Sequence, residues 1–279
     1  MPQWNCNCPN CRAARKSRCF LSQSSALVSE DGKNWLLLNA SPDLSFQFAS
    51  FPQLSVSGRK SRGSPIEAVI LTDGEIDHVA GLLSLREHKS LRLVCTPAVK
   101  SLLSDSLGLL PALEKYTSIQ LQAFPVRVAG IKITALELAT DKAPRYAPRF
   151  RRSGSVVGLR LESIRSKRSC VYLPGLPAIT KELDEWVSGC DCLLVDGTFW
   201  SDREMISLGL SQRTARDMGH VAIDGKDGSL AWLRRLDIPR KIYTHINNSN
   251  PILRKGSPQR RAVERAGVEI SHDQMAIRL

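Results

Sequence analysis

Long apolar runs are missing from this chain of 279 residues: no stretch approaches the roughly 18 apolar residues of a membrane-spanning helix. The first residues, MPQWNCNCPN, also lack the basic start and the apolar stretch of a secretory signal. We therefore expect a protein with no membrane span that works in the cytoplasm.

Aromatic side chains are scarce, at 6% of the residues, although the formal net charge is +12. Proteins that bind single-stranded nucleic acid combine a basic groove with rings on which bases stack. Here the basic residues are scattered, with short clusters at residues 12–18, 59–62, 145–152 and 254–265. We expect a solvated basic surface and no nucleic-acid partner.

The eight cysteines lack the even spacing of a secreted disulfide scaffold, and three of them form one C-x-C-x-x-C motif at Cys6, Cys8 and Cys11. Three thiolates this close in sequence can surround one zinc ion. A tetrahedral site needs a fourth ligand, for which Cys19 and His272 are the candidates. With four protein ligands there is no open position, so this zinc would be structural. The alternative is a loop with three free thiols.

Strand-like and helix-like runs alternate along the chain, which favours the mixed α/β (α+β) class, with helices covering mixed sheets. We predict a single domain over residues 1–279, with a cysteine-rich segment at residues 1–20. The predicted helices are residues 79–86, 97–103, 178–187, 229–236 and 258–266. The predicted strands are residues 26–29, 35–39, 68–71, 91–95, 131–136, 156–161, 170–173, 192–195, 241–244, 268–270 and 275–278.

The stretch LTDGEIDH, residues 71–78, places three acids and a histidine where a predicted strand ends. Open α/β sheets bind ligands at this end of their strands. Asp73, Glu75, Asp77 and His78 can converge on a hard cation, with one nitrogen among oxygen donors. The alternative is a strand–turn–helix with solvated acids.

Two more potential ligands follow predicted strands, Asp196 after CLLV and His245 after KIYT. Together with His78 they supply two imidazoles and a carboxylate, a ligand set that suits non-haem Fe(II) and oxygen chemistry. Asn247 and Asn248 follow closely and could hydrogen-bond a polar substrate or form a turn.

DGEIDH has the spacing of the HxHxDH motif of the metallo-β-lactamase superfamily, with Asp77 and His78 at its last two positions and acids at its first two. Longer blocks resemble the coenzyme PQQ synthesis protein B family of that superfamily. They are PQWNCNCPNC at 2–11, NWLLLNASPD at 34–43, LTDGEIDHVAGLLSLRE at 71–87, LLVDGTFW at 193–200, MGH at 218–220 and YTHINNSNP at 243–251. The resemblance implies a four-layer αββα sandwich. The family normally begins with a strand before the first block, so we expect that first strand to be missing here.

The resemblance also implies that Asp77, His78, Asp196 and His245 bind the active-site metal. A two-zinc hydrolase of this superfamily uses about as many metal-bound histidines as this whole chain contains. We therefore expect one Fe(II) at the active site and a separate structural Zn(II).

Two roles follow from a related phosphodiesterase branch. That branch closes a similar three-cysteine site with a distant histidine, which favours His272 as the fourth zinc ligand. It also uses a histidine that matches His220 as a proton donor, so we expect acid–base catalysis by His220, with loop capping as the alternative. Asp73 and Glu75 are expected to act in catalysis beside it.

The family is associated with biosynthesis of pyrroloquinoline quinone (PQQ). The resemblance therefore implies a non-haem iron oxygenase that hydroxylates the tyrosine ring of a small peptide-derived substrate, with other pathway proteins as possible partners. The alternatives are an aid to PQQ transport to the periplasm, a metal-dependent phosphodiesterase and a non-catalytic metal-binding scaffold. Asp73 and Glu75 add negative charge, which disfavours phosphodiesters and suits a phenol or amine. The oligomeric state is not indicated.

Overall fold

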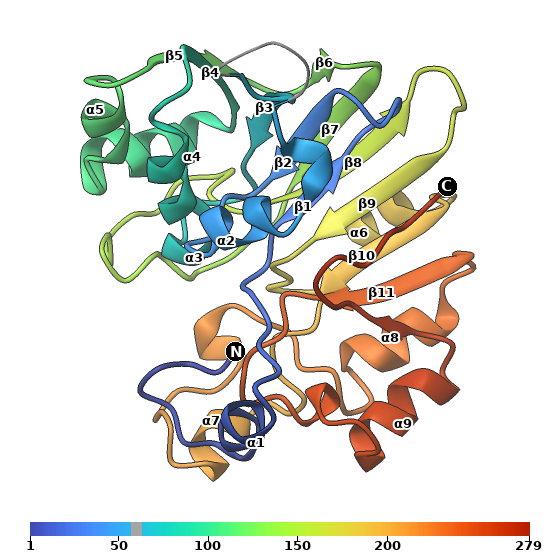
Figure 1. Cartoon of the computed structure of the whole chain (residues 1–279). Coiled ribbons are helices and arrows are strands. Elements are labelled where there is room, and N and C mark those ends of the chain that lie inside the picture. The colour runs from blue at the N-terminus through green and yellow to red at the C-terminus, as the bar shows by residue number, and fades with distance from the viewer. Residues whose placement is uncertain (57–62) are drawn as a thin grey trace. The chain divides into compact units, whose positions relative to one another are not determined.

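The computed structural model describes residues 1–56 and 63–279, so the predicted basic cluster at 59–62 lies outside the described residues. The chain divides into two compact units (Figure 1). We call residues 23–139 and 143–167 the central unit, and residues 1–22, 140–142 and 168–279 the terminal unit, because the latter contains both chain ends.

The central unit contains a five-stranded sheet in the order β1-β2-β3-β4-β5. Its strands are β1 (Ala26–Val28), β2 (Trp35–Leu38), β3 (Ile66–Ile70), β4 (Ser90–Val94) and β5 (Ser118–Gln122). Only β1 and β2 pair antiparallel, and the other neighbours are parallel. Three more strands of this unit, β6 (Val126–Val128), β7 (Ile131–Glu137) and β8 (Val157–Ser163), pair antiparallel in the order of the chain.

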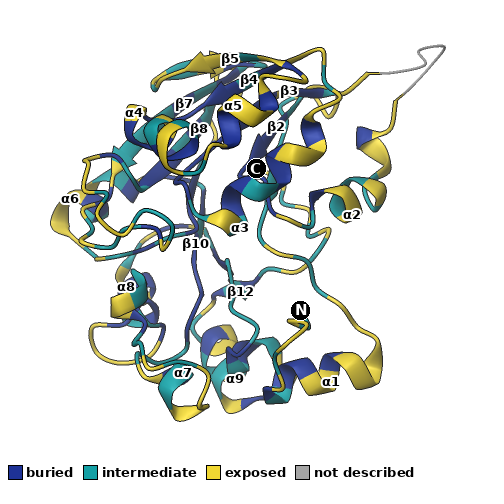
Figure 2. Cartoon of the chain, turned by 90° about the vertical axis from the view of Figure 1, so that its left-hand side faces the viewer, coloured by how far each residue is buried: buried dark blue, intermediate teal, exposed yellow. Residues whose placement is uncertain are grey.

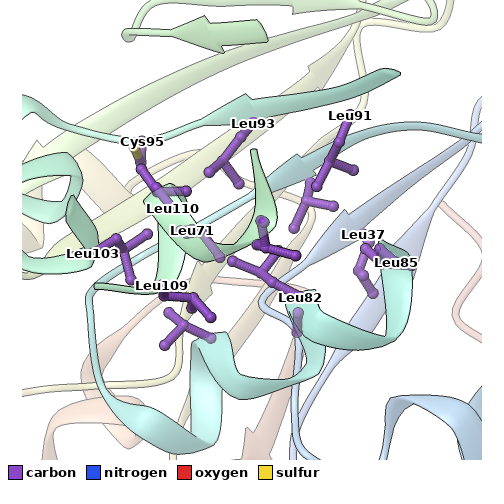
Figure 3. Close-up of a cluster of buried hydrophobic side chains, with 14 of the residues drawn as sticks. Leu37, Leu71, Leu82, Leu85, Leu91, Leu93, Cys95, Leu103, Leu109 and Leu110 are labelled. Carbon is purple, nitrogen blue, oxygen red and sulfur yellow. The ribbon is translucent and has the colours of Figure 1, made fainter. Parts of the chain in front are cut away.

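Short helices of the central unit pack leucine side chains onto β3 and β4. They are α2 (Leu44–Ala49), η1 (Pro52–Leu54), α3 (Ile76–Val79), η2 (Ala80–Leu85), α4 (Pro97–Ser101), η3 (Leu102–Ser106) and α5 (Leu109–Leu113). Figure 3 shows Leu82 of η2, Leu103 of η3 and Leu110 of α5 in one buried cluster with Leu71 and Leu93. Each fully buried leucine contributes about 1.5–3 kcal/mol of transfer free energy. This core fixes the end of β3, where the acidic turn begins.

The terminal unit is built on four parallel strands in the order β12-β11-β10-β9. They are β9 (Ser169–Leu173), β10 (Cys192–Asp196), β11 (Arg240–Thr244) and β12 (Glu269–Ile270). Its helices are α1 (Pro9–Ser17), α6 (Lys181–Val187), α7 (Glu204–Ser207), η4 (Arg216–Met218), α8 (Ser229–Arg235), η5 (Pro251–Leu253) and α9 (Pro258–Arg265). Figure 2 shows that β10 is mostly buried, as expected for an apolar run between two parallel neighbours.

The ends of β10 and β11 bring two site residues together. Asp196 is the register partner of Thr244, so His245 follows directly at the same sheet edge. Gly197 permits this approach, because a Cβ atom there would lie 3.0 Å from the Tyr243 side chain and 3.1 Å from the Thr244 carbonyl oxygen. The C-terminal edge of this sheet therefore positions a carboxylate beside an imidazole.

The predicted mixed α/β class is confirmed, and the single-domain assignment stays a prediction. The strand predicted at 275–278 is wrong: these residues adopt no strand, and Met275 instead donates its N–H to the His272 carbonyl in a turn. The helix predicted at 79–86 is mainly the 3₁₀ helix η2. No helix among the described residues is long and apolar enough to cross a membrane.

Candidate metal centres

The three cysteines of the C-x-C-x-x-C motif gather at the start of α1. Cys8 is the N-cap, and its sulfur accepts a hydrogen bond from the Cys11 N–H at 3.4 Å. Pro9 occupies the first turn, where a missing N–H costs nothing. The sulfurs of Cys6, Cys8 and Cys11 lie within 4.8 Å of one another. Three soft sulfur donors at this spacing fit zinc.

The surroundings favour ionisation of Cys8. Burial raises the pKa of the Cys8 thiol, but the backbone N–H of Cys11 and the neighbouring thiols outweigh burial, so the net shift is downward. The pKa of Cys11 is raised, by burial and by its neighbours Cys8 and Cys6. Since a thiolate is the metal-binding form, the lowered pKa of Cys8 favours metal binding.

The neighbour that touches all three sulfurs is Asn248. Its side-chain Nδ2 lies 3.2 Å from the sulfur of Cys6, 3.6 Å from that of Cys8 and 3.3 Å from that of Cys11. His272 and Cys19 are both exposed, and neither belongs to the group of closely spaced ligand atoms found among residues 1–56 and 63–279. His272 instead lies beside Asp273, whose carboxylate accepts two hydrogen bonds from Ser22.

The acidic turn of the central unit contains a buried carboxylate–imidazole pair. Both carboxylate oxygens of Asp73 lie 2.8 Å from Nδ1 of His78. Because a carboxylate can only accept, Nδ1 donates the proton of this hydrogen bond, and Nε2 is the ring nitrogen left to bind a metal. This is how metal-binding histidines are held in one tautomer and orientation. Asp73 therefore positions His78 in this structure, whereas its predicted catalytic role stays a prediction.

The Asp73 carboxylate is itself held by its neighbours. Thr72 donates its hydroxyl at 2.7 Å and the backbone N–H of Glu75 donates at 2.9 Å. Thr72 in turn contacts the side chain of Asn39, which is fully buried. Burial raises the pKa of the Asp73 carboxyl, but the charge and hydrogen bond of His78 and these donors outweigh burial, so the pKa lies below its ordinary value.

A tyrosine covers the same turn. The hydroxyl of Tyr146 donates to the carbonyl oxygen of Gly74 at 2.5 Å. A side chain at position 74 would meet that hydroxyl at 2.9 Å and Leu102 at 3.0 Å, so a larger residue here would displace Tyr146 from the turn. Burial raises the pKa of Tyr146, and the charges of Glu75 and Asp73 raise it further. The phenol therefore stays protonated and keeps donating to the turn.

In the terminal unit, Asp196, His220 and His245 form a second group whose ligand atoms lie within 4.8 Å of one another. Nδ1 of His220 lies 2.5 Å from Oδ2 of Asp196, and Nδ1 of His245 lies 3.7 Å from Oδ1. The two imidazole rings are stacked, with centroids 5.7 Å apart. One carboxylate and two imidazoles are a ligand set for iron, copper or zinc.

Thr198 connects the two sides of this group. Its hydroxyl lies 2.5 Å from Oδ1 of Asp196 and 2.8 Å from Nδ1 of His245. Since the carboxylate only accepts, the hydroxyl donates to Asp196 and accepts the Nδ1 proton of His245. Burial raises the pKa of Asp196, but His220 and His245 outweigh burial, so the pKa is held well below its ordinary value. Asp196 is thus a permanent anion between two imidazoles.

The segment that follows β11 joins this group to the cysteine cluster. His245 has φ +52°, in the left-handed region that non-glycine residues rarely adopt. The side chain of Asn250 donates to the Gly197 carbonyl oxygen at 2.8 Å. The hydroxyl of Ser249 donates to Glu204 at 2.5 Å, and burial raises the pKa of that carboxyl. Residues 245–250 therefore hold one predicted metal ligand and the asparagine that touches the cysteines.

Sequence reasoning missed the residues that orient these groups. Thr72 and Thr198 belong to no metal motif; the only signal was a polar side chain inside a buried block, in LTDGE and in LLVDGTFW. Tyr146 lies in a proline- and arginine-rich loop far from the turn in sequence. For Asn248 the sequence suggests a substrate contact or a turn, and not a place beside the cysteines.

Comparison with known proteins identifies the superfamily first. The beta-lactamase superfamily domain model matches residues 34–246, which is most of the chain. Coenzyme PQQ synthesis protein B of Klebsiella pneumoniae is 42% identical, with 100% of this chain and 94% of the relative covered. The protein of the same name from Azoarcus sp. (strain BH72) is also 42% identical, with 100% and 95% covered.

A solved structure agrees with these relatives. The crystal structure of Zn²⁺-bound PqqB from Methylobacterium extorquens superposes with a TM-score of 0.90 at 36% identity, covering 100% of this chain and 95% of that one. The fold is thus of the metallo-β-lactamase type, and the chain belongs to the coenzyme PQQ synthesis protein B family. The resemblance drawn from the sequence blocks is confirmed.

Proposed function

We propose that this chain acts in PQQ biosynthesis, as an iron- and oxygen-dependent hydroxylase of the tyrosine ring of a small peptide-derived precursor. The observation that carries the proposal is the Asp196–His220–His245 group. It places a ligand carboxylate, Asp196, and a ligand imidazole, His245, beside the imidazole of His220, whereas the acidic turn carries Asp73 and Glu75 where a two-zinc hydrolase has histidines. That donor set suits one iron better than two zincs.

The proposed iron ligands are Asp77, His78, Asp196 and His245. When bound, Fe(II) supplies the activation of dioxygen that ring hydroxylation requires. In the overall reaction one oxygen atom enters the ring and the other leaves as water, with two electrons from an external two-electron reductant. The chain's own part is orientation: an Nδ1 hydrogen bond fixes the ring of each ligand imidazole and leaves Nε2 as the metal-binding nitrogen, through Asp73 for His78 and through Thr198 for His245.

His220 is the proposed acid–base group. Its Nδ1 is held by Asp196 at 2.5 Å, so a proton can be taken up or released at Nε2. Glu75 adds negative charge beside the acidic turn. A phenol or an amine can donate a hydrogen bond to a carboxylate, whereas a phosphodiester is repelled by it. These features favour a tyrosine-containing substrate over a phosphodiester.

The proposed structural zinc belongs to the cysteine cluster. Its donors are Cys6, Cys8 and Cys11, whose sulfurs are already close together at the start of α1. A Cys8→Ser variant should lose about one zinc per chain and melt at a lower temperature, because metal binding contributes to folding free energy. Unchanged zinc content and melting temperature would remove this site from the proposal.

The function is tested with anaerobically purified protein loaded separately with iron, manganese or zinc. Iron-loaded protein, given ascorbate and a Glu- and Tyr-containing peptide, should consume oxygen and add 16 Da (about one oxygen atom) to the peptide. His245→Ala should abolish this, and His88→Ala, which lies outside both groups, should not. A generic phosphodiester is assayed in parallel. Efficient phosphodiester cleavage, or full activity with two zincs and no iron, would overturn the proposal in favour of a hydrolase.

Metal binding without turnover of either substrate would instead favour a scaffold or an aid to PQQ transport. Other PQQ pathway proteins remain proposed partners, and the cytoplasmic location stays a prediction.

A further inference from the structure

We propose that Asn248 is the fourth ligand of the cysteine-bound zinc, through its side-chain oxygen Oδ1. The inference rests on the structural zinc proposed above and replaces His272 and Cys19 as the closing ligand. It starts from the side-chain amide of Asn248, which contacts all three sulfurs.

The distances show whether the amide atom of Asn248 occupies a ligand position of a tetrahedral zinc site or the position of the zinc itself. Zn–S bonds of about 2.3 Å and a Zn–O bond of about 2.1 Å place a ligand oxygen roughly 3.5 Å from each sulfur. An atom at the centre would lie only about 2.3 Å from each sulfur. The terminal amide atom of Asn248 lies 3.2, 3.6 and 3.3 Å from the three sulfurs. It therefore stands where the fourth ligand of a tetrahedral site belongs.

The amide can present either of two atoms at that corner. In this structure Nδ2 faces the sulfurs. Rotation of the amide by half a turn exchanges Nδ2 and Oδ1 with almost no change in shape, and the two atoms are assigned from their hydrogen-bond partners. Of the two, only the oxygen has lone pairs available to bind a cation. A neutral amide also leaves the site with the charge of three thiolates and one zinc, −1 in all.

The backbone of Asn248 is fixed to the cysteine segment independently of its side chain. Asn10, which is 2% exposed, lies between Cys8 and Cys11. Its Nδ2 donates to the carbonyl oxygen of Asn248 at 2.9 Å and to that of Asn250 at 2.7 Å. The helix turn that carries the cysteines and the segment that carries Asn248 are therefore clamped together. A side chain changed at position 248 would keep this clamp, which makes substitution there a clean test.

Cobalt(II) substitution gives a readout specific to this site, because only thiolate ligands produce the intense sulfur-to-cobalt charge-transfer band. Apparent affinity is measured by competition with a chelator, and zinc per chain by native mass spectrometry. Asn248→Leu keeps the size but offers no donor. Its affinity should fall by at least the roughly 10–100-fold that loss of an outer-shell partner costs. Asn248→His, with a stronger zinc ligand, should bind as tightly as the wild type or more so.

Asn248→Asp decides between an oxygen ligand and a hydrogen-bond donor. If Oδ1 binds the metal, the aspartate retains or strengthens binding. If the amide serves only to donate N–H groups to sulfur, the aspartate repels the thiolates and should bind as weakly as the leucine variant, which would overturn the inference. Circular dichroism verifies that each variant is folded.

His272→Ala and Cys19→Ala are the matched controls, and both should leave the cobalt band and the affinity unchanged. Loss of metal in either one would also overturn the inference. Absence of the charge-transfer band in the wild type would instead refute the zinc site itself, so the two failures are distinguishable.

Discussion

Each unit holds a buried carboxylate that fixes an imidazole by its Nδ1 atom. Asp73 fixes one imidazole, whereas Asp196 fixes one directly and a second through Thr198. In the central unit, Asp73 gives both oxygens to His78, at 2.8 Å each. In the terminal unit, Asp196 gives one oxygen to His220 and the other to Thr198, which passes the contact on to His245.

The exposure of the imidazoles follows this division. The His78 side chain is 4% exposed, against 12% for His220 and 15% for His245. A ring held by two oxygens inside the core has one orientation, which suits a permanent ligand. The two stacked rings of His220 and His245 are more exposed, which suits an acid–base group beside a ligand at a site that a substrate must reach. An aspartate with histidine thus forms a buried, fixed pair in the central unit and a more exposed group in the terminal unit.

The largest expected effect is that of removing Asp196. Asp196→Ala leaves the His220 imidazole, the Thr198 hydroxyl and the backbone N–H groups of Leu176 and Thr198 without their buried acceptor. Breaking a buried charged pair costs about 3–5 kcal/mol of unfolding free energy. Urea unfolding of the metal-free protein measures this loss of unfolding free energy. The control is Asp237→Ala, at an exposed position, whose unfolding free energy should lie within about 0.5 kcal/mol of the wild-type value. A loss below about 1 kcal/mol would contradict the central position given to Asp196.

Asp73→Asn should act on metal affinity more than on folding. The amide can no longer hold His78 with two accepting oxygens, and loss of such a partner weakens metal binding about 10–100-fold. Manganese(II) binding followed by electron paramagnetic resonance, with the cysteine site saturated with zinc, provides the measurement. Glu67→Gln changes an exposed carboxylate on β3 and should have no effect. Equal affinity in all three proteins would mean that Asp73 does not position a ligand.

The two threonines sharpen the comparison. Thr72→Val and Thr198→Val each remove a buried hydroxyl from a carboxylate, and each should lower unfolding free energy by about 1–2 kcal/mol. Only Thr198 also contacts a proposed ligand, Nδ1 of His245. Thr198→Val should therefore weaken manganese binding several-fold, while Thr72→Val leaves it nearly unchanged. A larger loss of manganese affinity in Thr72→Val than in Thr198→Val would contradict the role given to the Thr198 hydroxyl.

The smallest effect is expected from an ion pair at the surface. Arg240 holds Glu269 with two hydrogen bonds and lowers the pKa of that carboxyl below its ordinary value of 4.5. A lowered carboxyl pKa stabilises the fold above pH 4.5, and this contribution is lost as the pH falls through the folded value. Because the pair is partly exposed, Glu269→Gln should cost at most about 1 kcal/mol at pH 7. The difference from wild type should shrink toward pH 3 in urea titrations, whereas a constant difference would point to packing.

Local patterns were sufficient to predict the buried strands. The runs WLLL and CLLVD are apolar, short and bounded by polar residues, and both form strands. The strand β5, SIQLQ, was missed because it is mostly exposed and too polar to stand out. Residues 275–277 form a short apolar run like that of a buried strand, but a strand also needs a partner, which the pattern cannot supply.

The candidate sites were predictable only where the residue type itself carries metal chemistry. Cysteine, histidine and aspartate at strand ends or in tight spacing signal a ligand, and the structure brings Cys6, Cys8 and Cys11 together. The residues that complete or orient these groups, Thr198 and Asn248, are common polar types, so their sequence context does not mark them as parts of a metal site. Helix α1 is not predicted either, because its first turn is the cysteine motif, whose spacing indicates a metal-binding turn.

The clamp between Asn10 and Asn248 has a consequence for the synthesis of the protein on the ribosome. The two residues are 238 positions apart. At a synthesis rate of about 5–20 residues per second, the cysteines emerge roughly 10–50 seconds before the segment that completes their surroundings. During that interval the three thiols are open to oxidants and to foreign metals. Expression in a reducing, zinc-sufficient cell should therefore decide how much of the chain matures correctly, even though the finished cluster is mostly buried.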